Sequence, residues 1–338
     1  MRNLRTVLTA AAVVSGVIAI GVGSARVPVA AAGAPLQTPA TSGGDRARLL
    51  GTYRLVTTER KDAAGKWTLT PGFNSTGYIT YSDSGYMGVH IMPKDRPKFA
   101  AAQPTAEEAQ AALRGYTAYF GPFIMNEKDQ IVTHHRIGTL SPGGDPDFKR
   151  YYDFVGNRLI LTPVPATGGK EEATNHLIWE RQPDAPLSAE AKKFAGVSQL
   201  LYTDRYTEKD GKIVARGERN DTRAGSWIIY TPTGHMMVHL MDKAGRLTSA
   251  GRGAPPDRAI ATYRSYAGYF GRFAVHDSEN PRSVVHNQEG TINPGRETDA
   301  KLLYEFNGNV LRLAEPQTTA NGETAGELQY WERLPSLK

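Results

Sequence analysis

The chain of 338 residues contains no cysteine. That absence excludes disulfide bonds, thiolate metal sites, a cysteine nucleophile and a lipid-carrying N-terminal cysteine. A Ser-His-Asp order, a phosphate-binding glycine loop and a motif of paired carboxylates are missing as well. No run of Lys or Arg has the pattern that follows a phosphate backbone. We therefore expect no nucleic-acid partner, no metal and no cofactor.

Long apolar runs are also missing, except at the N-terminus. Arg2 and Arg5 precede the uncharged apolar run 6–22, and small residues follow at 23–25 and 30–32. This order is that of a secretory signal peptide. The alternative is a retained membrane anchor, but the run is short and rich in Ala and Gly for a transmembrane span. We predict a signal peptide over 1–25, a flexible leader over 26–44, and a secreted or periplasmic protein without a stable membrane span.

The composition is that of a globular protein rich in strands and turns. Hydrophobic residues make up 40% of the chain and charged residues 22%. A disordered chain has a smaller hydrophobic fraction. The 35 glycines, 21 prolines and 16 tyrosines favour strands and turns over helices. The length is sufficient for two domains with complete cores.

An internal repeat is the strongest signal in the sequence. "YTAYFGPF" at 116–123 returns as "YAGYFGRF" at 266–273, about 150 positions later. Four further blocks recur in the same order with nearly the same spacing, including the closing "WER" of each copy. A whole domain has therefore been duplicated in tandem. We place domain 1 at 45–183, a Pro-containing linker at 184–189 and domain 2 at 190–335.

Within one copy the pattern is mainly β. "GYITYSDSGYMGVHIM" and "DFVGNRLILTP" each alternate apolar and polar residues around a turn, which predicts two hairpins. "TAEEAQAALRGYTAYF" predicts one helix from Thr105 to Phe120, with Tyr116 and Tyr119 on a common face and Gly121 where the chain leaves it. Many strands and one short helix favour a closed barrel, because closure leaves no exposed strand edge.

Each copy resembles the bacterial and fungal lipocalin-like domain family. The residues that carry the resemblance in copy one are "LLGTYRLV", the "GYITYSDSGYM" hairpin, "YTAYFGPF", "THHRIGTLSPG", "GNRLIL" and "WER". The resemblance implies two tandem β-barrels, each with one short helix and a cavity for a small molecule. It does not imply one activity.

Both copies depart from the pattern of true lipocalins, whose first strand carries Gly-x-Trp packed under a late Arg. Copy one has Tyr53 at the aromatic position, and copy two has Ser198 there. Members of the lipocalin-like family tend to have Glu before the glycine of the sixth block. Copy two keeps it as Glu289, whereas copy one has Ile137. We therefore expect the two barrels to bind differently.

Histidines are repeated between the copies without a metal-binding spacing. His235 and His239 are four apart, but on a strand that separation is about 13 Å, too far for one ion. His134 and the next residue, His135, point to opposite faces of a strand. A structural role is therefore an open alternative for each histidine.

Strand alternation groups the candidate binding residues by face. Tyr86, His90 and Met92 share one face of their strand, and His134 shares a face with Arg136. Two alternatives remain: these faces line the barrel and bind a ligand, or the opposite faces, with Met87 and Val89, form a plain apolar core.

Two classes of function remain, and we favour a secreted binding protein for a small hydrophobic or aromatic molecule. The alternative is a cofactor-independent isomerase, cyclase or lyase that moves a proton with His or Tyr. We place the ligand site in copy one, where the candidate residues are Tyr86, His90, Tyr119, His134 and Arg136. Tyr119 or His134 would exchange a hydrogen bond or proton with the ligand, and Arg136 would neutralise an acidic group on it.

Overall fold

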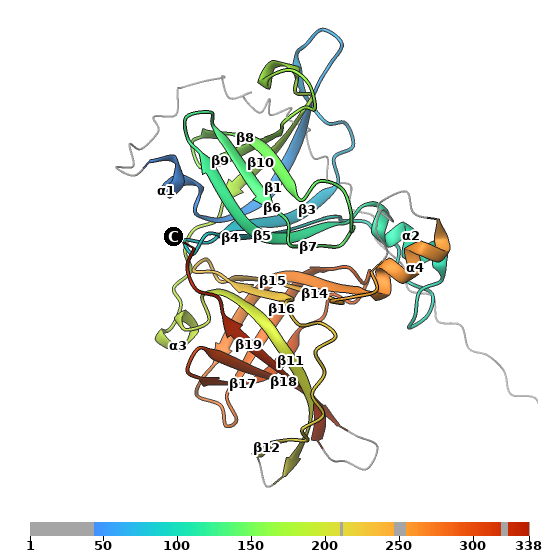
Figure 1. The fold of residues 1–338 in the computed structure, drawn as a ribbon, viewed down its shortest axis with the longest axis vertical. Helices are drawn as coiled ribbons and strands as arrows, with labels where there is room; N and C mark the ends of the chain where they lie inside the picture. The colour runs from blue at the N-terminus through green and yellow to red at the C-terminus, as the bar shows by residue number, and fades with distance from the viewer. Residues whose placement is uncertain (1–43, 210–211, 247–254, 319–323, 338) are drawn as a thin grey trace, which may run out of the picture. The chain divides into compact units, whose positions relative to one another are not determined.

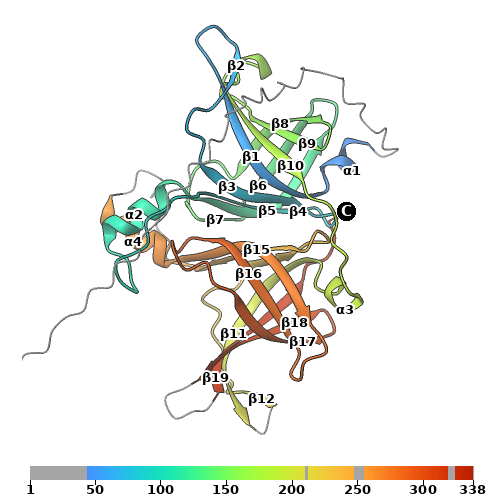
Figure 2. The ribbon, with the colours of Figure 1, turned by 180° about the vertical axis from the view of Figure 1, so that it is seen from behind.

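The computed structural model describes residues 44–209, 212–246, 255–318 and 324–337, so the predicted signal peptide and most of the leader lie outside the described residues. Two closed barrels of 8 strands follow one another along the chain (Figures 1 and 2). The first barrel closes where β10 pairs with β1, and the second where β19 pairs with β11. This confirms the prediction of a tandem pair of β-barrels.

The first barrel runs through α1 (Asp45–Leu49), β1 (Gly51–Lys61), β2 (Trp67–Leu69), β3 (Ser75–Tyr81), β4 (Tyr86–Pro93), α2 (Ala106–Arg114), β5 (Thr117–Asn126), β6 (Ile131–His135), β7 (Gly138–Thr139), β8 (Asp147–Val155), β9 (Arg158–Pro163), a 3₁₀ turn (Lys170–Glu172) and β10 (Asn175–Arg181). The order of paired strands is β10-β9-β8-β6-β5-β4-β3-β1-β2, with β7 on β5. Both predicted hairpins are present, as β3–β4 and β8–β9.

The second barrel repeats this arrangement with α3 (Ala189–Lys192), β11 (Gly196–Lys209), β12 (Lys212–Ala215), β13 (Trp227–Tyr230), β14 (His235–Met241), α4 (Pro256–Arg264), β15 (Tyr266–His276), β16 (Ser283–Thr291), β17 (Ala300–Asn307), β18 (Val310–Thr318) and β19 (Thr324–Arg333). The chain crosses from β10 to α3 through the predicted linker.

The predicted helix 105–120 is too long. Thr105 caps α2 with a capping box, as its sequence indicates, but the helix ends at Arg114 and β5 begins at Thr117. Tyr116 and Tyr119 therefore do not share a helical face: Tyr116 packs between the barrels, and Tyr119 points into the first barrel.

Gly121 also has a different role from the predicted helix exit. It lies within β5, where a Cβ atom would come within 1.9 Å of the backbone oxygen of His135. Its counterpart Gly271 in β15 meets the oxygen of Asn287 in the same way, at 2.0 Å. These glycines let two neighbouring strands approach at a bulge, which sharpens the bend of each barrel.

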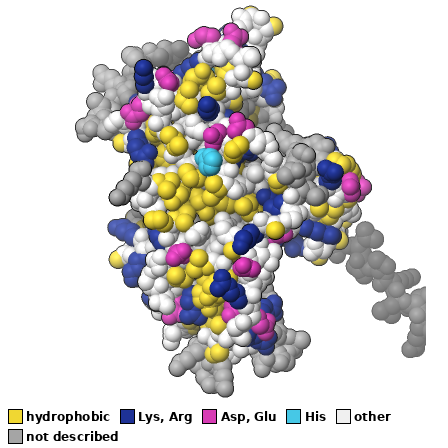
Figure 3. All heavy atoms as spheres, in the orientation of Figure 1, with side chains coloured by type: hydrophobic (Ala, Val, Ile, Leu, Met, Phe, Trp, Pro, Cys, Tyr) yellow, Lys and Arg dark blue, Asp and Glu magenta, His cyan; other side chains and the backbone are white. Residues whose placement is uncertain are grey.

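Three large apolar clusters lie inside the first barrel, inside the second barrel and between the barrels, and a small fourth cluster contains Tyr206, Ala314 and Leu328. Both barrels belong to one compact unit. Helices α2 and α4 lie side by side in both views (Figures 1 and 2). On the face of the molecule shown in Figure 3, hydrophobic side chains gather over the middle, whereas charged side chains are scattered. No described helix combines the length and apolar composition needed to cross a membrane.

The interface between the barrels has an approximate two-fold symmetry. Arg96 donates from its guanidinium to the backbone oxygens of Thr291 and Ile292 in the second barrel. Arg246 does the same in reverse, to the backbone oxygens of Thr139 and Leu140 in the first barrel. Because each arginine binds the residues equivalent to those its counterpart binds, the contact has the geometry of a symmetric dimer within one chain.

Candidate functional site

A Tyr-His-Tyr cluster lies inside each barrel. In the first barrel, the hydroxyl of Tyr81 is 2.7 Å from Nε2 of His134, and the hydroxyl of Tyr119 is 2.9 Å from its Nδ1. The three side chains come from β3, β5 and β6, and the histidine is completely buried. The sequence-based prediction therefore brought Tyr119 and His134 together correctly and missed Tyr81.

The second barrel repeats the cluster with the same geometry. Tyr230 is 2.7 Å from Nε2 of His286, and Tyr269 is 2.9 Å from its Nδ1. A neutral imidazole has one N–H and one bare nitrogen, so one tyrosine donates to it and the other accepts from it. The accepting tyrosine keeps its own O–H, and each barrel therefore holds one hydroxyl that can donate to a further group.

Burial keeps the histidine of each cluster neutral. It lowers the pKa of His134 well below its ordinary value, and the positive charge of Arg150 lowers that pKa further. In the second barrel burial alone lowers the pKa of His286 to about 3. Burial also raises the pKa of Tyr119, and the charges of Arg150 and Arg136 oppose that rise. At neutral pH both clusters are uncharged.

Arg136 lies beside the first cluster, as the sequence suggested. Its guanidinium carbon is 3.5 Å from the ring centroid of Phe148, and that ring meets the ring of Tyr119 edge-on at 5.7 Å. Arg150 was missed. It is paired in register with Val132, which is part of the interior cluster, so Arg150 shares the inward face of β8 with Phe148. A positive charge at an inward-facing position of a strand is the signal that could have found it.

Tyr86 and His90 are not part of this cluster. They lie on the outward face of β4, which packs against the second barrel. Tyr86 donates to the backbone oxygen of Pro335, and His90 stacks on His239 with ring centroids 4.1 Å apart. The five candidate residues therefore form two groups, and Met87 and Val89 line the barrel in place of Tyr86 and His90.

The stacked histidines belong to the interface between the barrels. Nδ1 of His90 is 3.0 Å from the hydroxyl of Tyr116, and Nδ1 of His239 is 2.7 Å from that of Tyr266. Burial lowers the pKa of His90 to about 3. Within the described ranges, no three His, Asp or Glu side chains come together as a metal site.

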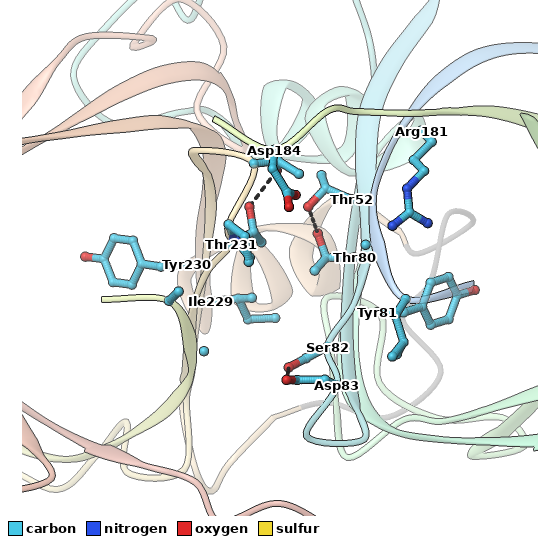
Figure 4. A pocket seen from close by; sticks show the side chains of 16 residues that line it. Thr52, Thr80, Tyr81, Ser82, Asp83, Arg181, Asp184, Ile229, Tyr230 and Thr231 are labelled. Carbon is cyan, nitrogen blue, oxygen red and sulfur yellow. Dashed lines mark hydrogen bonds between the residues drawn. The ribbon is translucent and has the colours of Figure 1, made fainter. Parts of the chain in front are cut away.

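A pocket of about 290 Å³ lies where the two barrels meet (Figure 4). Its hydroxyls are already paired: Thr52 with Thr80 at 3.2 Å, and Thr231 with Thr233 at 2.8 Å. Tyr81 and Tyr230 contribute backbone there, while their rings turn away into their own barrels (Figure 4). Because its hydroxyls already bond one another, this pocket is a weaker candidate than the barrel interiors.

The two interiors differ in one buried donor. Trp179 and Trp331 are equivalent, and both are almost completely buried. Nε1 of Trp331 donates to the side-chain oxygen of Gln329 at 3.0 Å, whereas Nε1 of Trp179 has no hydrogen-bond partner among the described residues. Leu177 stands where the second barrel has the glutamine. The interior of the first barrel thus keeps a donor that none of the described residues satisfies.

The ends of the barrels also differ. In the first barrel Arg181 donates to the hydroxyl of Tyr53 at 3.2 Å, which reproduces the packing of an aromatic ring under a late arginine. In the second barrel Ser198 leaves no ring at this position of the strand, and Phe194 fills the interior from just after α3. In the second barrel the aromatic side chain therefore comes from the segment after α3, whereas in the first barrel it comes from β1.

A family model for the lipocalin-like domain matches residues 50–182 and 220–334. The chain belongs to this lipocalin-like family. This confirms the resemblance noted in the sequence, and it shows that both barrels are lipocalin-like domains.

Similar solved structures include a protein of unknown function from Nostoc punctiforme, with 7% identity, 85% of this chain and 97% of that chain covered, and a TM-score of 0.21. Another is transferrin binding protein B, a vaccine antigen of Haemophilus parasuis, with 8% identity, 82% and 65% covered, and a TM-score of 0.21. No curated protein matches the chain. These similarities are too weak to inform its function.

Proposed function

We propose that this chain is an exported binding protein whose first barrel holds a small hydrophobic or aromatic molecule. The observation that carries the proposal is Nε1 of Trp179, which has no hydrogen-bond partner among the described residues and lies in an interior that is mostly apolar and aromatic. An unpaired buried donor costs about 1–3 kcal/mol, and a ligand that offers an acceptor removes that cost. The spare hydroxyl of the Tyr-His-Tyr cluster is a second donor for the same ligand.

Partial exposure around the interior supports access to it. Met125, Phe148 and Phe154 pack against the buried cluster of the first barrel and are only partly buried. Apolar side chains that face inward and still meet solvent are typical of a barrel with a reachable interior. A hydrophobic ligand would cover these side chains.

Proton-transfer catalysis, the second candidate, has a weaker basis. The neutral Tyr-His-Tyr cluster could pass a proton along its hydrogen bonds. However, burial lowers the pKa of His134 and raises that of Tyr119, so both groups move away from the range in which acid–base catalysis works at neutral pH. The same cluster occurs in both barrels despite their other differences, which favours a hydrogen-bonding role over a catalytic one.

Native mass spectrometry of the chain purified from its own host tests the binding role. We expect one small molecule per chain. Leu177→Gln, which gives Trp179 the partner that Trp331 has, should reduce its occupancy, and Gln329→Leu in the second barrel should not. A chain that carries no molecule, before and after incubation with a host lipid extract, would contradict the proposal.

Export is tested separately by N-terminal sequencing of the native protein. We expect a mature chain that begins between Arg26 and Pro35. A chain with intact Met1 in the soluble cytoplasmic fraction would contradict export and leave the binding role unaffected.

A further inference from the structure

Two arginines beside the Tyr-His-Tyr cluster of the first barrel lack an acidic partner. Neither Arg136 nor Arg150 forms an ion pair with any carboxylate of the described residues. Arg136 donates to the backbone oxygen of Asp145, and its Nε is buried without a hydrogen-bond partner. Arg150 donates to the backbone oxygen of Lys149 at 2.9 Å. Both guanidinium groups therefore keep donors for another molecule.

Two carboxylates of the neighbouring segment, Asp145 and Asp147, accept hydrogen bonds from other groups. An oxygen of Asp145 accepts from the backbone N–H of Asp147 at 2.8 Å. An oxygen of Asp147 is 2.6 Å from Nδ1 of His135, on the outward face of β6. The carboxylate of Asp145 attracts Arg136 through its charge, but burial has the larger effect and lowers the pKa of this arginine. Neither guanidinium is therefore held in an ion pair by a carboxylate of the described residues.

Phe148 holds the two arginines close to the cluster. Its ring centroid is 3.5 Å from the guanidinium carbon of Arg136 and 5.0 Å from that of Arg150. Arg150 also acts through its charge on Tyr81, Tyr119 and His134, which are completely buried or nearly so. A positive field is therefore directed at the Tyr-His-Tyr cluster, which has a spare hydroxyl.

The second barrel lacks this arrangement although it keeps the Tyr-His-Tyr cluster. The equivalents of Arg136, Phe148 and Arg150 are Gln288, Ala300 and Leu302. Leu302 is buried in the apolar cluster of that barrel. The cluster therefore does not need the arginines in order to fold, and their presence in the first barrel requires another explanation.

We infer that the molecule held by the first barrel is an organic anion, a carboxylic acid with an apolar or aromatic body. Its acid group pairs with Arg136 and Arg150 and accepts from the Tyr-His-Tyr cluster, while its body contacts Phe148 and the interior. This inference rests on the proposed binding role. A charged hydrogen bond in a partly desolvated site is stronger than a neutral one, so the anion gains where a neutral analogue does not.

Two fluorescent probes with one ring skeleton test the inference. N-phenyl-1-naphthylamine is neutral, and 8-anilinonaphthalene-1-sulfonate adds an anionic group that stands in for a carboxylate. We expect the first barrel to bind the anionic probe about tenfold or more tightly than the neutral one. Arg150→Leu and Arg136→Gln, which introduce the residues of the second barrel, should each remove about that factor for the anionic probe alone.

Control variants separate local charge from fold and net charge. Lys149→Leu removes a positive charge from the outward face of the same strand and should leave both affinities unchanged. Arg150→Lys should keep part of the preference for the anion. Thermal melting followed by circular dichroism identifies any variant that is unfolded, and Arg136→Gln then provides the test if Arg150→Leu does not fold.

The outcomes distinguish the inference from the proposed function. Equal affinities for the two probes, unchanged in both arginine variants, would overturn the anion and leave a neutral ligand in the barrel. Absence of binding for both probes would count against the binding role itself and therefore also against the inference. Loss of the neutral probe in Arg150→Leu would show that the arginine shapes the barrel and does not select charge.

Discussion

The two barrels have the same strand arrangement and the same central hydrogen-bond cluster, but their interiors differ in other residues. Both have the Tyr-His-Tyr cluster, the reciprocal arginine contacts and the closing strand pairs. The buried Trp331 of the second barrel has a hydrogen-bond partner, whereas its equivalent Trp179 has none among the described residues. Leu302 of β17 faces inward in the second barrel, and its equivalent in β8 of the first barrel is Arg150. The comparison separates residues that maintain the fold from residues that are available to a ligand.

The shared interface makes each barrel part of the packing of the other. The cluster between them includes large rings from each side, among them Tyr116, Phe120, Tyr266 and Phe270. Gly88 lies opposite His239, and a Cβ atom on it would come within 2.9 Å of the sulfur of Met237. Either barrel alone would expose this face, so the second barrel supports the first even if it binds nothing.

Acidification should have the largest effect, and both barrels should contribute to it. Five histidines are buried and have lowered pKa values in the folded state: His90, His134, His235, His239 and His286. Between the unfolded value near 6.5 and about 4, the unfolded chain binds more protons at each of these histidines, so stability falls as pH falls. Each histidine costs about 1.4 kcal/mol per pH unit in this window.

Thermal melts between pH 7 and pH 4 measure this loss. The double variant His90→Gln/His239→Gln should show about three-fifths of the pH dependence that the histidines cause, because two of the five groups no longer titrate. A melting temperature that stays constant from pH 7 to pH 5 would contradict the assignment of neutral histidines in both barrels.

Removal of the central histidine should have the next largest effect and should not distinguish the barrels in stability. His134→Ala and His286→Ala each leave two buried tyrosine hydroxyls without their partner. We expect each to lower the free energy of unfolding by about 2–4 kcal/mol in urea titrations. Only His134→Ala should weaken ligand binding. A stable His134→Ala variant beside an unstable His286→Ala variant would show that the two clusters are not equivalent.

The buried tryptophans should give the smallest effect and the clearest contrast. Trp331→Phe leaves the oxygen of Gln329 unpaired and should cost about 1–3 kcal/mol more than Trp179→Phe, which removes a donor that has no partner. Urea denaturation of the two variants, without ligand, measures the difference. Equal losses would mean that the donor of Trp179 is satisfied in solution.

Much of the fold was readable from the sequence because duplication repeats each pattern. The two hairpins, the capped start of α2 and the tandem arrangement all follow from local residues. The end of α2 could not be predicted in this way. The segment "RGYTAYF" has apolar residues at helical spacing, but its apolar and polar residues also alternate as in a strand. Its neighbour β4 settles the choice through pairing across the barrel, which local spacing does not reveal.

The candidate site was only partly readable for a related reason. Strand β4 is buried on both faces, since one face lines the first barrel and the other meets the second barrel. Alternation reports which residues share a face, but it cannot say which of two buried faces encloses the ligand. Tyr86 and His90 were therefore grouped with Tyr119 and His134, although they belong to the interface.

A crystal structure of the chain purified from its own host, with its retained molecule, tests the central claim most directly. The account predicts density for one molecule inside the first barrel, with an acceptor near Nε1 of Trp179 and its acid group at Arg136 and Arg150, and none inside the second barrel. Density in the second barrel, or in the pocket lined by Thr52 and Thr231 with the first barrel empty, would contradict it.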